Sequence, residues 1–132
     1  MADVTAKQFI LCKSTELKEK GSGLRFLVRI NNEVRPAFVL RFMDKPRAYL
    51  NECAHQAMEL DLQEGLFFDR SGQYIICATH GALYSPDKGL CISGRCDGRS
   101  LTPISVVETG KNICFVAKAG LEFISLANDL AN

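Results

Sequence analysis

The sequence lacks any excess of charge of one sign. Its 16 Lys and Arg residues nearly balance its 15 Asp and Glu residues, which gives a formal net charge of +1. A protein that binds duplex nucleic acid normally carries a basic stripe that neutralises phosphates, whereas the basic residues here are scattered along the chain. This balance argues against a nucleic-acid partner and against an acidic tail.

Long apolar runs are also missing. The longest, such as residues 37–40 and 66–68, fall far short of the ~20 residues that a helix needs to cross a bilayer, so we expect no membrane partner. Residues 1–8 lack the basic segment and the apolar stretch of a secretory signal peptide. We therefore expect a cytoplasmic protein, in which six cysteines indicate metal binding or redox chemistry rather than a disulfide framework.

Helix signals are scarce, and most of the sequence is typical of short strands separated by turn residues. At 132 residues the chain has the size of one domain with its own hydrophobic core. Strand-like apolar segments occur at residues 8–13, 24–30, 34–43, 47–50, 74–77, 101–107 and 112–117. In the second of these, Phe26, Val28 and Ile30 share one face opposite two arginines, so that face should be buried. The pattern predicts an all-β antiparallel sandwich or barrel.

The middle and the end of the chain depart from this pattern. Turn formers, Cys and His crowd between residues 51 and 98, which predicts a functional subdomain of about residues 50–98 inserted into a single domain of residues 1–132. Within the 56–76 insertion, to which the sequence assigns no function, a hairpin is expected to turn at Ser71 and Gly72. Residues 121–130 have apolar residues at roughly helical spacing, which predicts a short packing helix.

The chain has only two histidines, and each follows a cysteine closely. The two pairs are Cys53-Ala54-His55 and Cys77-Ala78-Thr79-His80. A C-x-H loop and a C-x-x-H loop can each place one thiolate and one imidazole on the same side of a tight bend. Two such loops would grip a metal centre from opposite sides, so these two cysteines and two histidines are the candidate metal ligands.

Several interpretations of these four residues are open at this point. Buried cysteines and hydrogen-bonded histidines are the default for isolated residues, but that default leaves the paired spacing unexplained. Zinc takes the same Cys₂His₂ set, although zinc fingers pair Cys with Cys and His with His. A Cys-His nucleophile uses only one pair. A [2Fe–2S] cluster with two imidazoles on one iron requires one ligand to each iron from each loop, as the mixed pairs would provide.

The sequence around both pairs resembles the Rieske [2Fe–2S] family. The resemblance covers Tyr-Leu-Asn-Glu-Cys-Ala-His at residues 49–55 and Ile-Cys-Ala-Thr-His-Gly-Ala-Leu-Tyr at the start of residues 76–89. These segments look like the two cluster-binding loops of small bacterial members. The resemblance implies a Rieske-type β-sandwich with an inserted cluster-binding subdomain and one [2Fe–2S] cluster per chain. It also implies that the two cysteines bind the buried iron and the two histidines the outer iron.

Gly81, Ala82 and Tyr84 follow the second histidine and are expected to surround the cluster as the next shell of contacts. High-potential respiratory relatives carry a serine two residues after this histidine and a tyrosine four residues after it, so one hydrogen-bond donor is missing here. Those relatives also tie the loops with a disulfide at the positions of Met58 and Thr79, which cannot form in this chain. Both differences indicate the lower-potential, ferredoxin-like members of the family.

The resemblance implies a one-electron carrier rather than an enzyme. It would take an electron from a reductase and pass it to a terminal oxygenase or another oxidoreductase. A terminal oxygenase also needs a mononuclear iron site, usually with two histidines, and both histidines are already used. Two alternatives stay open: a small subunit or redox-sensing module of a reductase, and a zinc-stabilised interaction domain.

The remaining four cysteines lie outside the two pairs. The family's third loop corresponds to residues 93–98, where an arginine replaces the usual proline. Cys91 and Cys96 flank the start of this loop and are expected to stay reduced in the cytoplasm, with a redox-active or structural pair as the alternative. Cys12 and Cys114 lie in apolar strand patterns and are expected to fill the core.

Overall fold

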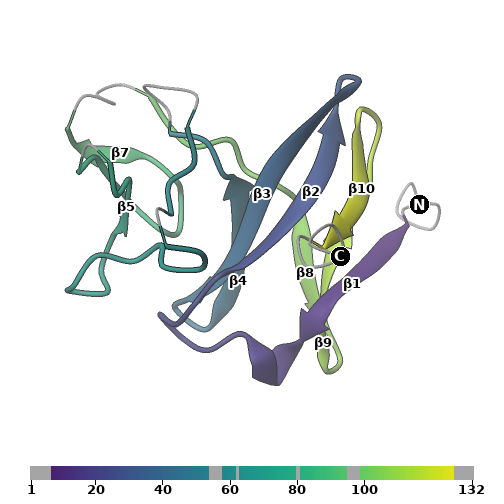
Figure 1. Cartoon of the computed structure of the whole chain (residues 1–132). Helices are drawn as coiled ribbons and strands as arrows, with labels where there is room; N and C mark the ends of the chain where they lie inside the picture. Colours follow the sequence, from purple (N-terminus) through teal and green to yellow (C-terminus); the bar gives the residue numbers. More distant parts are fainter. Residues whose placement is uncertain (1–6, 54–57, 62, 80, 95–98, 127–132) are drawn as a thin grey trace.

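The computed structural model describes residues 7–53, 58–61, 63–79, 81–94 and 99–126. Among these residues nearly all regular structure is β-strand, and one short 3₁₀ turn, η2 (Ser14–Glu16), follows the first strand. The predicted all-β fold is confirmed (Figure 1). In the described ranges we find no helix with the length and apolar character needed to cross a membrane.

Two antiparallel sheets form the scaffold. One has the strand order β1 (Gln8–Lys13), β9 (Asn112–Val116), β8 (Val106–Thr109). The other has the order β10 (Leu121–Leu126), β2 (Leu24–Ile30), β3 (Glu33–Phe42), β4 (Lys45–Leu50). Most of these bounds lie within a few residues of the segments that period-two alternation predicts. The buried face of β2 carries Phe26 and Val28, as predicted.

The two sheets enclose an apolar cluster that we call the inner core. Its buried residues come from both sheets and from the segments that join them: Leu11, Leu17, Phe26, Val28, Ala37, Val39, Ala48, Leu50, Ile104, Ile113, Phe115 and Leu121. Aromatic rings connect the sheets, since Phe9 stacks on Phe123 with ring centroids 5.2 Å apart and Phe26 meets Phe115 edge-on at 6.1 Å. The scaffold is therefore a β-sandwich.

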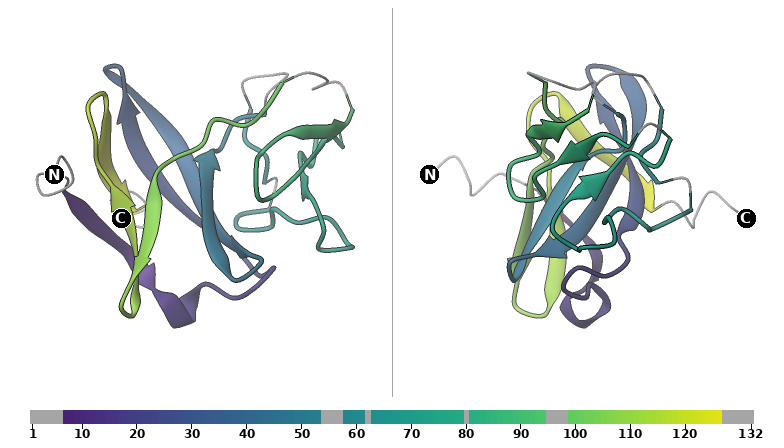
Figure 2. Two further views of the ribbon diagram at one scale, coloured as in Figure 1. Left: turned by 180° about the vertical axis from the view of Figure 1, so that it is seen from behind. Right: turned by 90° about the vertical axis from the view of Figure 1, so that its left-hand side faces the viewer.

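A third, small antiparallel sheet lies beside the outer face of the β3 and β4 strands (Figure 2). It has the order β5 (Ile75–Ile76), β6 (Leu83–Tyr84), β7 (Cys91–Ser93). A second apolar cluster, the outer core, joins it to the sandwich: Phe38, Leu40, Phe42, Tyr49, Cys53, Leu60, Phe67, Ile75, Cys77, Ala82, Tyr84 and Leu101. Phe38 of β3 stacks on Phe67 with ring centroids 3.9 Å apart. The region between residues 51 and 98 thus packs on the sandwich through a core of its own.

The loop before β5 contains the turn that the sequence predicts. Phe68 forms a β-bridge with Ile75, and the Asp69 N–H donates to the Tyr74 carbonyl at 2.9 Å. Gly72 has φ 72°, a left-handed conformation that glycine adopts readily. The expected hairpin at Ser71 and Gly72 is confirmed.

The predicted C-terminal helix over residues 121–130 is wrong in the part that the structure describes. Residues 121–126 form β10, which pairs antiparallel with β2, and residues 127–130 lie outside the described ranges. β10 satisfies the backbone groups along one edge of β2 and packs the ring of Phe123 into the inner core. Tertiary pairing of this kind outweighs a weak helical spacing of apolar residues.

Arg41 on β3 is a buried cation that joins distant segments of the sandwich. Its guanidinium donates to both carboxylate oxygens of Glu108 on β8, at 3.1 and 2.8 Å, and to the carbonyls of Leu17 and Ser14 at 2.6 and 3.2 Å. The hydrogen bonds from Arg41 lower the pKa of Glu108 to about 2, from an ordinary value of 4.5. The charged pair therefore stabilises the fold wherever Glu108 is ionised.

We predict that Glu108→Gln lowers the free energy of unfolding by about 1 to 2 kcal/mol at pH 7, a figure reduced for the 28% exposure of the Glu108 side chain. Because the pKa is lowered in the folded state, the wild-type advantage is complete above pH 4.5 and disappears as the pH falls through 2. Urea unfolding at several pH values measures this difference. The control is Glu122→Gln, whose carboxylate is 64% exposed beside Arg29 and should change stability by less than ~0.5 kcal/mol.

Candidate metal centre

Cys53 follows strand β4 and is buried in the outer core. Its backbone N–H donates to the Met58 carbonyl at 2.7 Å, which fixes the start and the end of the first predicted ligand loop relative to each other. His55, the second predicted ligand of this loop, lies outside the described residues. The structure therefore places the thiol of this pair and leaves the position of its imidazole a prediction.

Cys77 follows strand β5 and is fully buried in the same core. Its N–H donates to the Ala82 carbonyl at 2.9 Å, and its carbonyl accepts the Gly81 N–H at 2.7 Å, so the chain reverses tightly after the cysteine. Gly81 has φ 75°, the left-handed conformation that this reversal requires. His80 lies outside the described residues and stays a predicted ligand.

A hydrogen bond between backbone groups joins the two loops directly. The Ala78 N–H, one residue after Cys77, donates to the Leu60 carbonyl at 3.0 Å. Both cysteines belong to the outer core, so the fold places the two predicted thiol ligands in the same buried cluster. Within the described ranges no three residues of the types His, Cys, Asp and Glu gather closely enough to hold a metal, and both histidines fall outside these ranges.

Tyr84 and Ala82 lie close to the two loops, and their expected place around the cluster stays a prediction. The Tyr84 hydroxyl lies 3.4 Å from the Cys53 sulfur, and the whole side chain is buried. Ala82 is buried against Gly94, where an added Cβ would approach the Ala82 Cα to 2.9 Å and where φ is 106°. The second loop and the chain that leaves β7 are therefore in close contact at a point that only glycine can occupy.

Cys91 on β7 corrects one expectation. It is disulfide-bonded, so the prediction that it stays reduced is wrong in this structure, and Cys96 lies outside the described residues. The expectation for the sandwich cysteines is confirmed. Cys114 is buried and Cys12 packs against the inner core, where burial raises the pKa of the Cys12 thiol to about 11. A thiol with so high a pKa is unreactive at neutral pH.

Two further contacts of the site region are not predictable from motifs. Tyr49 on β4 donates its hydroxyl to the Pro86 carbonyl at 2.7 Å, and its buried ring lies so close to Gly89 that an added Cβ there would approach it to 2.7 Å. Burial raises the pKa of Tyr49 to about 12, so the hydroxyl remains a donor. This contact fixes the chain after β6 to the sandwich.

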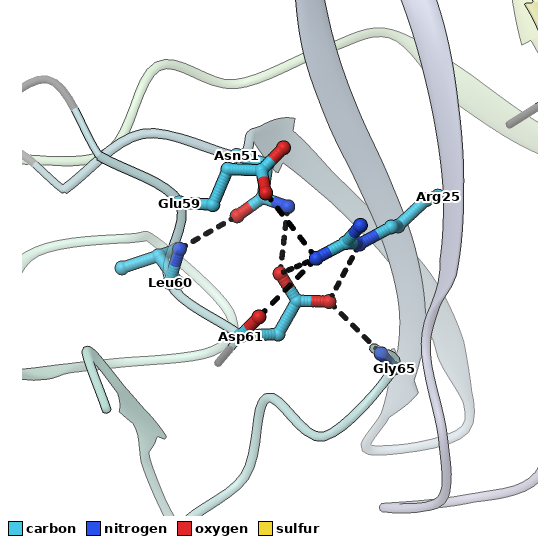
Figure 3. Close-up of polar contacts among 6 residues, drawn as sticks. All are labelled: Arg25, Asn51, Glu59, Leu60, Asp61 and Gly65. Carbon is cyan, nitrogen blue, oxygen red and sulfur yellow. Dashed lines mark hydrogen bonds and ion pairs between the residues drawn. The ribbon is translucent and has the colours of Figure 1, made fainter. Parts of the chain in front are cut away.

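A second contact connects the first loop to the sandwich through polar side chains. Asn51 and Asp61 are buried and hydrogen-bonded to each other, and Arg25 on β2 reaches Asp61 from the sandwich (Figure 3). Sequence reasoning placed Arg25 on a solvent-facing side of its strand and gave no role to the other two. The one signal in the sequence was the position of Asn51, two residues before the predicted ligand Cys53. The alternation of apolar and polar residues gives no indication of its role.

An all-β scaffold that presents two buried thiols from adjacent loops defines a candidate metal-binding domain. The sequence of residues 7–113 matches the Rieske [2Fe–2S] domain, so the chain belongs to the Rieske [2Fe–2S] family. Its cofactor is accordingly one [2Fe–2S] cluster per chain. A comparison with curated proteins found no match.

Solved structures share the fold. The ferredoxin of carbazole 1,9a-dioxygenase from Nocardioides aromaticivorans IC177 is 22% identical, with a TM-score of 0.65 over 85% of this chain and 99% of that chain. The ferredoxin of Sphingomonas yanoikuyae B1 is 16% identical, with a TM-score of 0.63 over 85% of this chain and all of that chain. A chain in the complex of reduced oxygenase and oxidised ferredoxin of carbazole 1,9a-dioxygenase is 20% identical, with a TM-score of 0.61 over 82% of this chain and 91% of that chain.

The described residues fit such a cluster on their own chemistry. Thiolates are the usual protein ligands of iron–sulfur clusters, and the two buried cysteines come from two loops that share a hydrogen bond. The Tyr84 hydroxyl offers a hydrogen bond to the sulfur of Cys53, and apolar side chains of the outer core surround both cysteines. These features are the protein's means of setting the reduction potential of such a site.

We predict that Tyr84→Phe lowers the reduction potential of the cluster and leaves the cluster assembled, because a hydrogen bond to a ligand sulfur stabilises the more negative, reduced state. Protein-film voltammetry measures the change. Tyr49→Phe is the matched control, since it removes a buried hydroxyl that donates to the Pro86 carbonyl instead of a sulfur. Equal shifts in the two variants would contradict this role of Tyr84.

Proposed function

We propose that the protein carries single electrons from a reductase to an oxygenase or another oxidoreductase, with its cluster bound by Cys53, His55, Cys77 and His80. The observation that carries this proposal is the burial of Cys53 and Cys77 in one core, on two joined loops of a chain that belongs to the Rieske [2Fe–2S] family. In each loop the predicted histidine ligand follows its cysteine by two or three residues.

Each part of the proposed site has its own task. When bound, the cluster accepts and releases one electron, and neutral imidazoles in place of thiolates raise its potential into a range of ~−150 to +300 mV. The cysteine sulfurs would hold it from the buried side, within the outer core. The Tyr84 hydroxyl, 3.4 Å from the Cys53 sulfur, would donate to that sulfur as a thiolate ligand, and the two histidines would supply the outer side.

Several observations support a carrier over an enzyme. The two histidines are both assigned to the cluster, which leaves no histidine for the mononuclear iron site of an oxygenase. Structures with the same fold are described as ferredoxins, and others as complexes of a ferredoxin with an oxygenase. These descriptions support an oxygenase as one protein partner, and the reductase is the electron source that a carrier of this kind requires.

Two further points belong to the proposal. We assign residues 1–132 to a single Rieske domain in which residues 50–98 form the cluster-binding part, as the separate outer core supports. We also assign the protein to the cytoplasm; the free thiols of Cys12 and Cys114 agree with a reducing compartment, whereas the disulfide bond of Cys91 does not. Cell fractionation tests the location.

We predict that the protein made with ample iron contains two irons and two sulfides per chain. After reduction with dithionite its electron paramagnetic resonance spectrum should show the lowered average g value of nitrogen-ligated [2Fe–2S] clusters. His80→Cys should lower the reduction potential, because a thiolate adds negative charge to the cluster, and Cys77→Ser should abolish assembly.

Cys12→Ser is the control for the cysteine substitution, because Cys12 lies in the sandwich and should leave the spectrum unchanged. A preparation that contains zinc alone would contradict the proposed function.

A catalytic assay distinguishes a redox-sensing module from a carrier. A carrier at catalytic concentration sustains substrate oxidation by an oxygenase supplied with a reductase, and a sensor does not.

A further inference from the structure

The carboxylate of Asp61 is completely buried and is surrounded by hydrogen-bond donors. Arg25 donates to it twice, from Nε to Oδ2 at 2.8 Å and from Nη2 to Oδ1 at 3.0 Å. The side-chain amide of Asn51 donates to Oδ1 at 2.9 Å, and the Gly65 N–H donates to Oδ2 at 2.9 Å. Figure 3 shows these groups converging on the carboxylate. We call Arg25, Asn51 and Asp61 the polar clamp.

The clamp joins the sandwich to the first ligand loop. Arg25 belongs to β2, whereas Asp61 belongs to the segment that follows the first loop. Asn51 comes directly after β4 and two residues before Cys53, and its side-chain oxygen also accepts the Leu60 N–H at 2.8 Å. The side chain of Asn51 thus holds the two ends of the first ligand loop together from the inside.

The clamp also reaches the second ligand loop through Leu60. The N–H of Leu60 is bound by Asn51, and the next residue is Asp61, so both sides of Leu60 are fixed. The carbonyl of Leu60 accepts the Ala78 N–H at 3.0 Å, next to Cys77. Hydrogen bonds and the short peptide segments between them therefore connect the guanidinium on β2 to Ala78, next to Cys77, and to Asn51, two residues before Cys53.

The chemistry of the clamp suits a positioning role. A buried carboxylate is unfavourable unless charge and hydrogen bonds compensate it, and here each carboxylate oxygen accepts two donors of fixed direction. The hydrogen bond with Asp61 raises the pKa of Arg25 above its ordinary value, so the guanidinium stays charged. A two-pronged Arg-carboxylate pair of this kind restricts orientation as well as distance.

We propose that Asp61 is a positioning residue of the metal centre, which with Arg25 and Asn51 sets the spacing of the two ligand loops. The inference rests on the proposed function, since the loops it positions are those assigned to the cluster. The clamp is connected to the second loop through the backbone of Leu60 and Ala78. The clamp would therefore affect how well the spacing of the two ligand loops matches the cluster.

The test is Asp61→Asn, which keeps the size of the side chain but turns an acceptor oxygen into a donor that faces donors. We expect cluster loss to a chelator to become about 10-fold faster, as for other substitutions just outside a metal's ligands, and the reduced-state paramagnetic resonance lines to broaden. We also combine Asp61→Asn with Arg25→Gln. If the two residues act as a unit, this double variant loses its cluster no faster than the more severe of the two single variants.

Glu108→Gln is the matched control, because it also breaks a two-pronged pair with an arginine but lies in the sandwich, where Arg41 also donates to the carbonyls of Leu17 and Ser14. It should lower unfolding stability and leave the rate of cluster loss and the spectrum unchanged. If Asp61→Asn behaves in the same way, Asp61 has only a structural role and the inference is overturned.

A second variant covers the case in which Asp61→Asn does not fold. Arg25→Lys keeps a positive charge beside the carboxylate but loses the second prong, so cluster loss should be faster than in the wild type, and an unchanged rate would overturn the inference. The wild-type protein separates the two proposals. If it shows no Rieske spectrum, the proposed function fails; if it does and the clamp variants match the control, only the positioning role fails.

Discussion

Strand β3 supports both halves of the molecule because it is buried on its two faces. Ala37 and Val39 point into the inner core, and Phe38 and Leu40 point into the outer core, all with no exposed surface. Antiparallel sheets commonly leave one face in water, but here the second face carries the region of the metal centre. The cysteine loops therefore pack against a strand that is buried on both faces and not against a peripheral hairpin.

The loops themselves are held by hydrogen bonds where some relatives are expected to use a covalent bridge. Met58 accepts the Cys53 N–H, and Leu60 accepts the Ala78 N–H, so the segment from 58 to 61 contacts the backbone at both buried cysteines. When ligands are held in fixed positions, they move less each time the bound cluster gains or loses an electron. Hydrogen bonds around the ligands are a general means of tuning the potential of such a site, and here the Tyr84 hydroxyl lies 3.4 Å from the Cys53 sulfur.

The sequence predicts features that repeat locally and misses those that join distant residues. Alternation located β1 and β2, and the spacing of Cys53 and Cys77 before histidines marked the site, whereas the positions of the histidines stay predictions. The helix expected at 121–130 was wrong because the apolar spacing there also suits a strand beside β2. Arg25 and Asp61 are 36 residues apart, and no local pattern relates them.

The contact between Gly94 and Ala82 restricts how the site can change during evolution. The gap between Gly94 and Ala82 has room for the hydrogen atom of a glycine but not for a methyl group. The backbone of Gly94 is also in the left-handed region. Any side chain at 94 would clash with Ala82, so the end of β7 and the second loop would have to move apart. Substitutions of neighbouring hydroxyl-bearing or charged residues can change the reduction potential over evolutionary time. Position 94 cannot contribute to such changes, because it must remain glycine.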